Sequence, residues 1–164
     1  NHMKLFKINF FLLIILPFFL NPFVVLASDY NNDWYNDFVE VNKSYKKGLK
    51  EYRNKNYLLA YNILLPLAEN NVSFAQSDIA GLFFNGWGVS QDYKKAFFWY
   101  KKSADNNNSY AQYKLGHMYW KGLGVRVDTD EAQVWWKLSA DNGYRDAQFA
   151  LPYQYCYIGK PQCN

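Results

Sequence analysis

The chain has 164 residues, half of them apolar or aromatic, which is enough for one domain with a sizeable core. Its formal net charge is +4, from 18 basic and 14 acidic residues, and loss of residues 1–27 with their two lysines lowers this to +2. Such a near balance argues against nucleic-acid binding, which normally shows as a stripe with a large excess of lysine and arginine.

The N-terminus has the pattern of an export signal. Residues 1–3 are expected to be a tag remnant and residues 4–27 a signal peptide, in which a basic pair precedes an uncharged stretch, Ile8–Ala27. Small residues at the last and third-last positions fit cleavage before Ser28. The sequence therefore predicts export to the periplasm or the medium, with residues 28–33 as a flexible mature N-terminus.

An uncleaved membrane anchor is the alternative, since about 20 apolar residues can span a bilayer. Pro17 and Pro22 interrupt the apolar run and disfavour a stable spanning helix. Any contact with a membrane is expected through this segment alone.

Downstream, the sequence repeats with a step of 36 residues, from Ala75-Gln76 to Ala111-Gln112 to Ala147-Gln148. Further positions coincide between the first two copies: Gly86/Gly122, Gly88/Gly124, Asp92/Asp128, Ala96/Ala132, Trp99/Trp135, Ser103/Ser139 and Ala104/Ala140. A period in this range indicates a solenoid, whose units must stack to bury their apolar faces. We therefore predict an all-α fold, an α/α solenoid of stacked helix-turn-helix repeats.

A degenerate N-terminal repeat is expected over residues 34–72, with helices over Trp34–Tyr52 and Lys55–Glu69. Three of its residues fall in register with the later copies: Tyr57, Ala60 and Ala68. Pro66 lies inside the second helix, where it removes one backbone hydrogen bond and should kink the helix.

The next repeat, residues 73–109, is predicted to form helices over Ala75–Asn85 and Tyr93–Asp105. Its turn begins at Gly86, because glycine adopts the left-handed conformation that ends a helix. Asp92 stands where an N-cap belongs.

The repeat over residues 110–145 follows the same pattern, with a first helix closed by Gly122 and a second helix behind the N-cap Asp128. Glu131, three residues after Asp128, is expected to reach back to the backbone and complete a capping box. The expected core faces are Ala111, Leu115, Met118 and Tyr119 on the first helix and Ala132, Trp135, Trp136, Ser139 and Ala140 on the second.

Residues 146–164 are predicted to form a C-terminal capping helix with a disulfide between Cys156 and Cys163, the two cysteines of the chain. A zinc site is the alternative, but beyond the tag only His117 supplies an imidazole, so no metal is expected.

The pattern Ala-Gln-x-x-Leu-Gly-x-x-Tyr-x-x-Gly-x-Gly-Val-x-x-Asp-x-x-x-Ala-x-x-Trp resembles the Sel-one-like repeat (SLR), a relative of the tetratricopeptide repeats. This resemblance implies a scaffold for protein–protein contacts, often exported, in bacteria that deal with host cells or envelope assembly. The sequence departs from the pattern at three positions: Ala80 where the next copy has Gly116, Phe83 in place of Tyr119, and Pro152 in place of a glycine.

A cysteine-rich branch of the resembled family has been credited with penicillin binding and β-lactamase activity, but it has a cysteine pair in every repeat. Ser44 and Lys47 match the Ser-x-x-Lys spacing of penicillin-recognising enzymes, without the other motifs of that class. His117 has no serine or cysteine at a helix-compatible spacing to activate. We therefore predict that the protein is not an enzyme and needs no cofactor, with the β-lactamase-like enzyme as the alternative class.

The remaining candidate function is recognition of a partner at the protein surface. Tyr113, His117 and Trp120 lie on the first-helix face opposite the core stripe, and first helices line the concave side of solenoids. The corresponding residues of the other units are Ser77, Gly81, Phe84, Phe149 and Tyr153. Aromatic side chains grouped on a surface are typical of binding hot spots; packing between adjacent first helices is the alternative, above all for Phe84 and Phe149.

The sequence thus predicts an exported scaffold that binds a protein or peptide partner in a concave groove. Its role would be that of an envelope or host-directed interaction factor, or alternatively that of a periplasmic immunity protein that neutralises a toxin.

Overall fold

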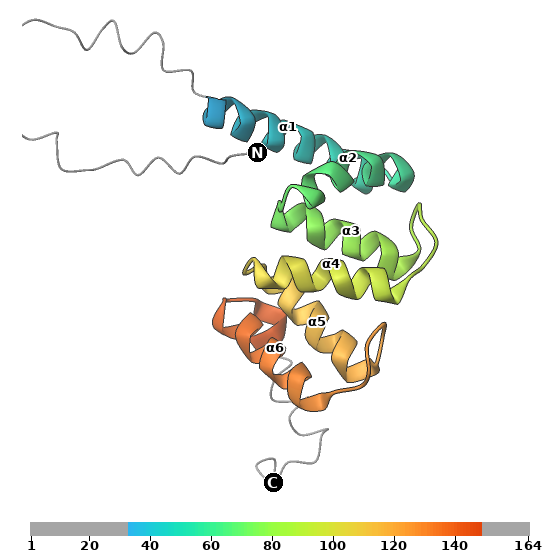
Figure 1. Cartoon of the computed structure of the whole chain (residues 1–164), viewed down its shortest axis with the longest axis vertical. Coiled ribbons are helices and arrows are strands. Elements are labelled where there is room, and N and C mark those ends of the chain that lie inside the picture. The colour runs from blue at the N-terminus through green and yellow to red at the C-terminus, as the bar shows by residue number, and fades with distance from the viewer. Residues whose placement is uncertain (1–32, 149–164) are drawn as a thin grey trace, which may run out of the picture. The chain divides into compact units, whose positions relative to one another are not determined.

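The structure is a computed structural model that describes residues 33–148, and all packing discussed below lies in the compact unit that begins at Asn36. Six α-helices follow one another (Figure 1): α1 (Asp33–Arg53), α2 (Tyr57–Glu69), α3 (Ser73–Asn85), α4 (Tyr93–Asp105), α5 (Ser109–Lys121) and α6 (Thr129–Asp141). Residues 33–148 contain no strand, and none of these helices is long and apolar enough to span a membrane. The all-α prediction is confirmed.

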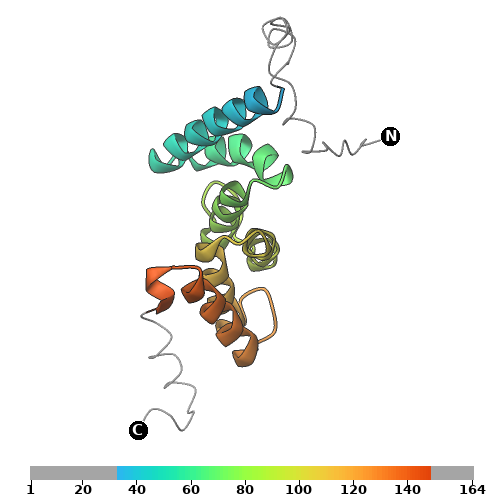
Figure 2. The ribbon, with the colours of Figure 1, turned by 90° about the vertical axis from the view of Figure 1, so that its left-hand side faces the viewer.

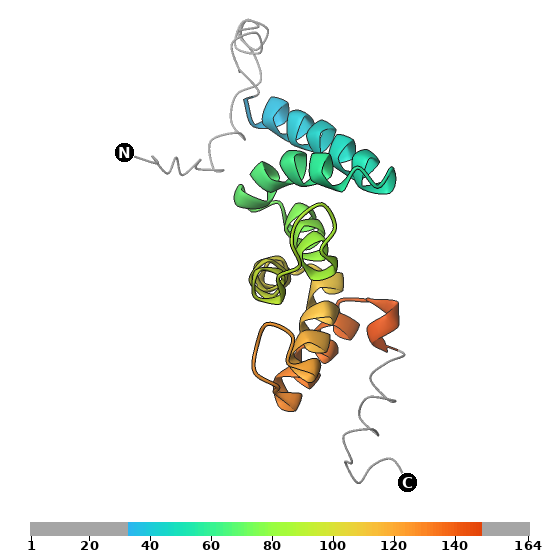
Figure 3. The ribbon, with the colours of Figure 1, turned by 90° about the vertical axis from the view of Figure 1, so that its right-hand side faces the viewer.

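Each helix packs on its neighbours in the chain. Contacts join α2 to α3, α3 to α4, α4 to α5 and α5 to α6, and Figures 2 and 3 show these helices side by side from two directions. Gly48 of α1 lies directly against Leu64 of α2, where a Cβ atom would come within 2.5 Å of the leucine side chain. Three helix pairs, α1–α2, α3–α4 and α5–α6, therefore stack as repeats.

Polar side chains fasten one repeat to the next, and they recur with the 36-residue step of the sequence. The amide nitrogens of Gln76, Gln112 and Gln148 donate to the carbonyls of the alanines eight residues earlier, at 3.1 to 3.2 Å. The glutamine oxygens of Gln76 and Gln112 in turn accept from Asn106 and Asn142. Because Gln76 and Gln112 are fully buried, these bonds satisfy groups that would otherwise be costly to bury.

Helix ends follow the predicted chemistry, except that α3 begins at Ser73, two residues before the predicted Ala75, and that two further corrections are needed. Asp92 and Asp128 cap α4 and α6 by accepting backbone N–H bonds, and Gly122 ends α5 in the left-handed conformation. The capping box is wrong, however, since the carboxylate of Glu131 accepts instead from the indole nitrogen of Trp135 at 3.1 Å.

The second correction is the start of α2. The helix begins at Tyr57 rather than Lys55, because Lys55 adopts a left-handed turn conformation (φ 63°) that a helix cannot contain. Beyond Pro66 the helix continues for three residues to Glu69.

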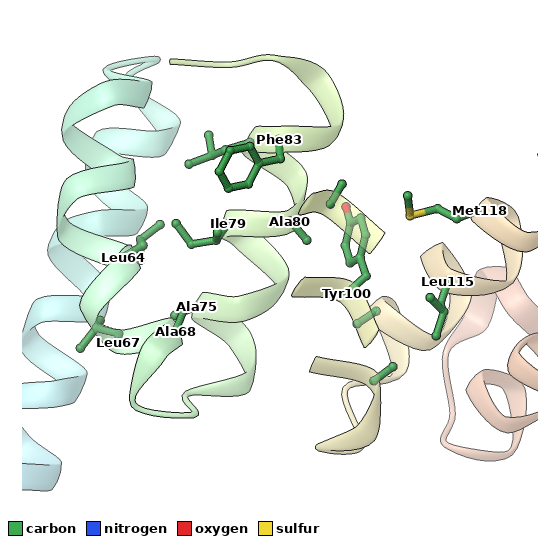
Figure 4. Packing of buried hydrophobic residues seen from close by; sticks show 14 of the residues in the cluster. Leu64, Leu67, Ala68, Ala75, Ile79, Ala80, Phe83, Tyr100, Leu115 and Met118 are labelled. Atoms are coloured by element: carbon green, nitrogen blue, oxygen red, sulfur yellow. The ribbon is translucent and has the colours of Figure 1, made fainter. Parts of the chain in front are cut away.

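The hydrophobic core runs continuously through the stacked pairs (Figure 4). Leu64 of α2 and Ile79 of α3 point toward each other, and Ala80 on the other side of α3 points toward Tyr100 of α4. All four are at most 1% exposed. Burial of such side chains provides the main stabilisation of a stacked helical array.

Equivalent positions of the second helices contribute one large buried side chain each to this core, Leu64 in α2, Tyr100 in α4 and Trp136 in α6. In α6 Trp136 is fully buried, whereas Trp135 is half-buried and packs under Lys101. The prediction that Trp135 belongs to the core face is therefore only partly right. Adjacent residues of a helix project about 100° apart, so only one of the two can face the core fully. Trp136 does so, and its indole N–H donates to the carbonyl of Tyr113 at 3.2 Å.

Candidate partner-binding face

The open surface of the first helices is narrower than the sequence predicts. Ser77 and Gly81 of α3, expected on the open side, are buried. A Cβ atom on Gly81 would meet the hydroxyls of Tyr52 and Tyr100 at 3.6 and 3.7 Å. A first helix in the middle of a stack is covered by its own second helix and by both neighbouring repeats, so the side opposite one core stripe faces another repeat.

What remains is a stripe that we call the open face. It comprises Phe38, Asn42 and Tyr45 of α1, Phe74 and Asp78 of α3, and Tyr110, Lys114, His117 and Lys121 of α5.

An aromatic side chain occupies the same repeat position in every first helix. Phe38, Phe74 and Tyr110 are spaced by 36 residues and are 60%, 62% and 39% exposed. Exposed large apolar groups in one row are unusual on a soluble surface and are typical of interaction sites. The ring of Tyr45 lies 6.3 Å from that of Phe74, which connects the row across α1 and α3.

The groove residues predicted on α5 lie along one edge of the open face. Tyr113, His117 and Trp120 are all half-buried. Tyr113 packs on Tyr144 at 5.3 Å between ring centroids, and Trp120 packs on Trp136 at 6.1 Å. The structure brings the three together but gives Tyr113 and Trp120 a share in packing.

Phe84 of α3 is half-buried and makes edge contacts with Tyr93 and Tyr100, so it packs between helices. Phe149 and Tyr153, like Cys156 and Cys163, lie outside the described residues.

The electrostatics of the open face differ between its helices. On α5, burial and the flanking Lys114 and Lys121 lower the pKa of His117, so its imidazole is neutral at pH 7. On α3, burial raises the pKa of Asp78 to about 6, although a hydrogen bond from the Tyr45 hydroxyl at 3.0 Å opposes this shift. The middle of the face thus carries an acid and its α5 end carries cations.

Phe74, Asp78 and Tyr110 were not among the residues predicted from the sequence. The sequence does contain a signal for this row, because Phe38, Phe74 and Tyr110 recur with the 36-residue step. The prediction did not find it because it assumed that each first helix buries one side only and exposes the opposite side.

Within residues 33–148 no three histidine, cysteine or acidic side chains gather where they could hold a metal ion.

The comparisons with known proteins agree with this architecture. A family model described as Sel1 repeat matches residues 73–108 and 109–144. A Sel1 repeat protein from Oxalobacter formigenes is similar in structure, with 29% identity and a TM-score of 0.66 over 72% of this chain and 49% of that protein. A protective antigen of uropathogenic Escherichia coli strains that displays an SLR fold has 27% identity and a TM-score of 0.67, over 75% of this chain and 28% of the antigen.

Cysteine rich protein B of Helicobacter pylori is also similar, at 20% identity and a TM-score of 0.55, over 68% of this chain and 95% of that protein. That similarity concerns the fold alone. This chain spans about half of the Oxalobacter protein and less than a third of the E. coli antigen. A comparison with curated proteins finds no significant match.

Proposed function

We propose that this chain, whose residues 73–108 and 109–144 match the Sel1 repeat, is an exported scaffold that binds a protein or extended peptide along its open face. Sel1 repeats form scaffolds suited to protein–protein interaction. The observation that carries the proposal is the row Phe38, Phe74 and Tyr110, one exposed aromatic side chain from each first helix. Aromatic anchors supply much of the binding free energy at protein interfaces.

Recognition rather than catalysis is the proposed role. Ser44 is half-buried on α1 while Lys47 is exposed, and neither lies on the open face. Burial and the flanking Lys114 and Lys121 lower the pKa of His117, and its ring lies 6.0 Å from that of Trp120.

The binding role is tested by site-specific photo-crosslinking in the native host. A benzoylphenylalanine replaces Tyr110 on the open face or, as a matched control, Phe98 on the outer side of α4, which is 50% exposed. We expect a discrete crosslinked partner from position 110 and none from position 98. Crosslinks from position 98 alone, or the same products from both positions, would contradict the proposal.

Export is proposed from the apolar segment Ile8–Ala27 and its Val-Leu-Ala end. Mass measurement of the protein from its native host checks this, with Ser28 expected as the first residue. A chain that retains this segment in a membrane fraction would instead indicate an anchor.

A further inference from the structure

A pocket of about 370 Å³ lies within the open face, between α1, α3 and the start of α5. Its walls include the rings of Tyr45, Phe74 and Tyr110, and its one ionisable acid is Asp78. In this pocket, aromatic side chains of the open face surround a carboxylate.

Asp78 has no cationic partner among the described residues. One carboxylate oxygen accepts the Tyr45 hydroxyl at 3.0 Å, and the ion pairs of residues 33–148 all involve other acids. Burial raises the pKa of Asp78, and no neighbouring cation lowers it. At neutral pH the pocket therefore holds a partly desolvated negative charge, which a bound cation would stabilise.

Phe74 offers the second half of a cation site. It is 62% exposed, and within residues 33–148 its ring contacts only that of Tyr45, at a tilt, so a face of the ring is accessible to a ligand. Tyr110, which also lines the pocket, already has Lys114 placed over its ring, with the ammonium nitrogen 5.3 Å from the centroid. An aromatic ring next to a carboxylate suits a planar guanidinium, which can stack on the ring and pair with the acid at once.

The repeat register makes this pocket specific to α3. The position of Asp78 is Asn42 in the preceding first helix and Lys114 in the following one. The open face therefore favours a bound cation at Asp78, whereas Lys114 at the equivalent position of the next repeat disfavours one.

We propose that this pocket receives one arginine side chain of an extended peptide partner, with its guanidinium paired to Asp78 and stacked on Phe74. The proposal rests on the proposed function, because it names the chemistry of a partner bound along the open face. It also fixes the register in which such a peptide lies along the stack.

The test is selection of random displayed 12-residue peptides on the full-length chain. We expect the bound peptides to share an arginine at one fixed position, and synthetic copies with citrulline there to bind at least tenfold more weakly. Asp78→Asn should cause a similar loss for the arginine peptides and none for the citrulline peptides. This variant keeps the acceptor for Tyr45, and its melting curve controls for folding.

The outcomes separate the two proposals. Peptides that show no arginine preference, prefer lysine, or bind Asp78→Asn as tightly overturn the arginine pocket. If such peptides still lose affinity on Tyr110→Ala, the open face remains a binding face. Selection of no peptide, or of peptides insensitive to both variants, contradicts both proposals.

Discussion

At the residue scale, one departure from the repeat pattern has a steric explanation. The second copy has the smaller residue Gly116 where the first has Ala80, and it has the larger inner ring, Trp136 where the first has Tyr100. A Cβ atom on Gly116 would lie 2.5 Å from two atoms of the Trp136 indole. The larger ring requires the smaller neighbour, so the two positions change together.

Gly116→Ala is therefore expected to destabilise the protein by about 1 to 3 kcal/mol, because overpacking outweighs the better helix propensity of alanine. In the double variant with Trp136→Tyr, the alanine should cost at least 1 kcal/mol less, as neighbouring positions couple. Urea unfolding of the four variants of the cycle measures this. Additive effects would show that the indole does not set the size of residue 116.

Replacement of Trp136 and of Trp120 by alanine should lower the stability of the protein by different amounts. Trp136→Ala empties a fully buried position and is expected to cost about 3 to 5 kcal/mol. Trp120→Ala removes a half-buried ring at the edge of the open face and should cost about 1 kcal/mol. Thermal melts of the two variants check the difference, and equal losses would place Trp120 in the core.

Asp78 should make stability depend on pH. Its pKa of about 6 in the folded protein exceeds its ordinary value of 3.8, so the cost of burying the charge is fully present above pH 6 and disappears as the pH falls toward 4. Asp78→Asn removes that cost. We expect the variant to be more stable than wild type by about 1 to 2 kcal/mol at pH 7.5, after allowance for solvent screening, and equal to it near pH 4.

Urea unfolding of both proteins at pH 7.5 and pH 4 measures this difference. Asp141→Asn, at an exposed position, serves as the control for a general change of charge. A variant less stable than wild type at pH 7.5 would show that the carboxylate has a stabilising partner.

At the scale of elements, the turns between paired helices hold successive repeats together. Gly124, in the turn after α5, approaches the start of α4 so closely that a Cβ atom would lie 2.1 Å from the carbonyl oxygen of Tyr93. Gly88 makes the equivalent approach to Tyr57 and Leu58 at the start of α2. The glycines of the repeat pattern thus serve packing between repeats as well as turn geometry.

Gly124→Ala is expected to cost about 3 kcal/mol or more, from the left-handed conformation and the collision with α4 combined. Gly143→Ala is the matched control, because Gly143 also has a positive φ but no atom within 4 Å of its Cβ position. It should cost about 1 to 2 kcal/mol. Similar losses in calorimetry for both variants would mean that the turn does not dock on α4.

The helices, their caps and most of the core could be predicted from the sequence, because the 36-residue step and local signals such as Asp92, Asp128 and Gly122 act over one turn or one repeat. The binding face could be predicted only in part. Which side of a first helix stays open depends on coverage by the neighbouring repeats, which is why Ser77 and Gly81 are buried. Pairing of Tyr45 with Asp78 joins residues of different repeats at positions that do not recur.

At the scale of the whole molecule, stacking of the repeats creates the open face of the described unit. Repeated side-chain bonds of Gln76 and Gln112 fix each repeat on the preceding one, so that the first helices present one open face. Such a face is pre-organised, and binding an extended segment to it costs little ordering of the scaffold.

The most direct test compares the affinity of the crosslinked partner for wild type, Phe74→Ser and Phe98→Ser by titration calorimetry. Both phenylalanines are at least half exposed, but Phe74 lies on the open face and Phe98 on the outer side of α4. We predict that Phe74→Ser weakens binding at least tenfold, or about 1.4 kcal/mol, with an unchanged melting temperature, while Phe98→Ser binds as wild type does. Equal affinity of Phe74→Ser and wild type, or a loss confined to Phe98→Ser, would contradict a recognition role for the open face.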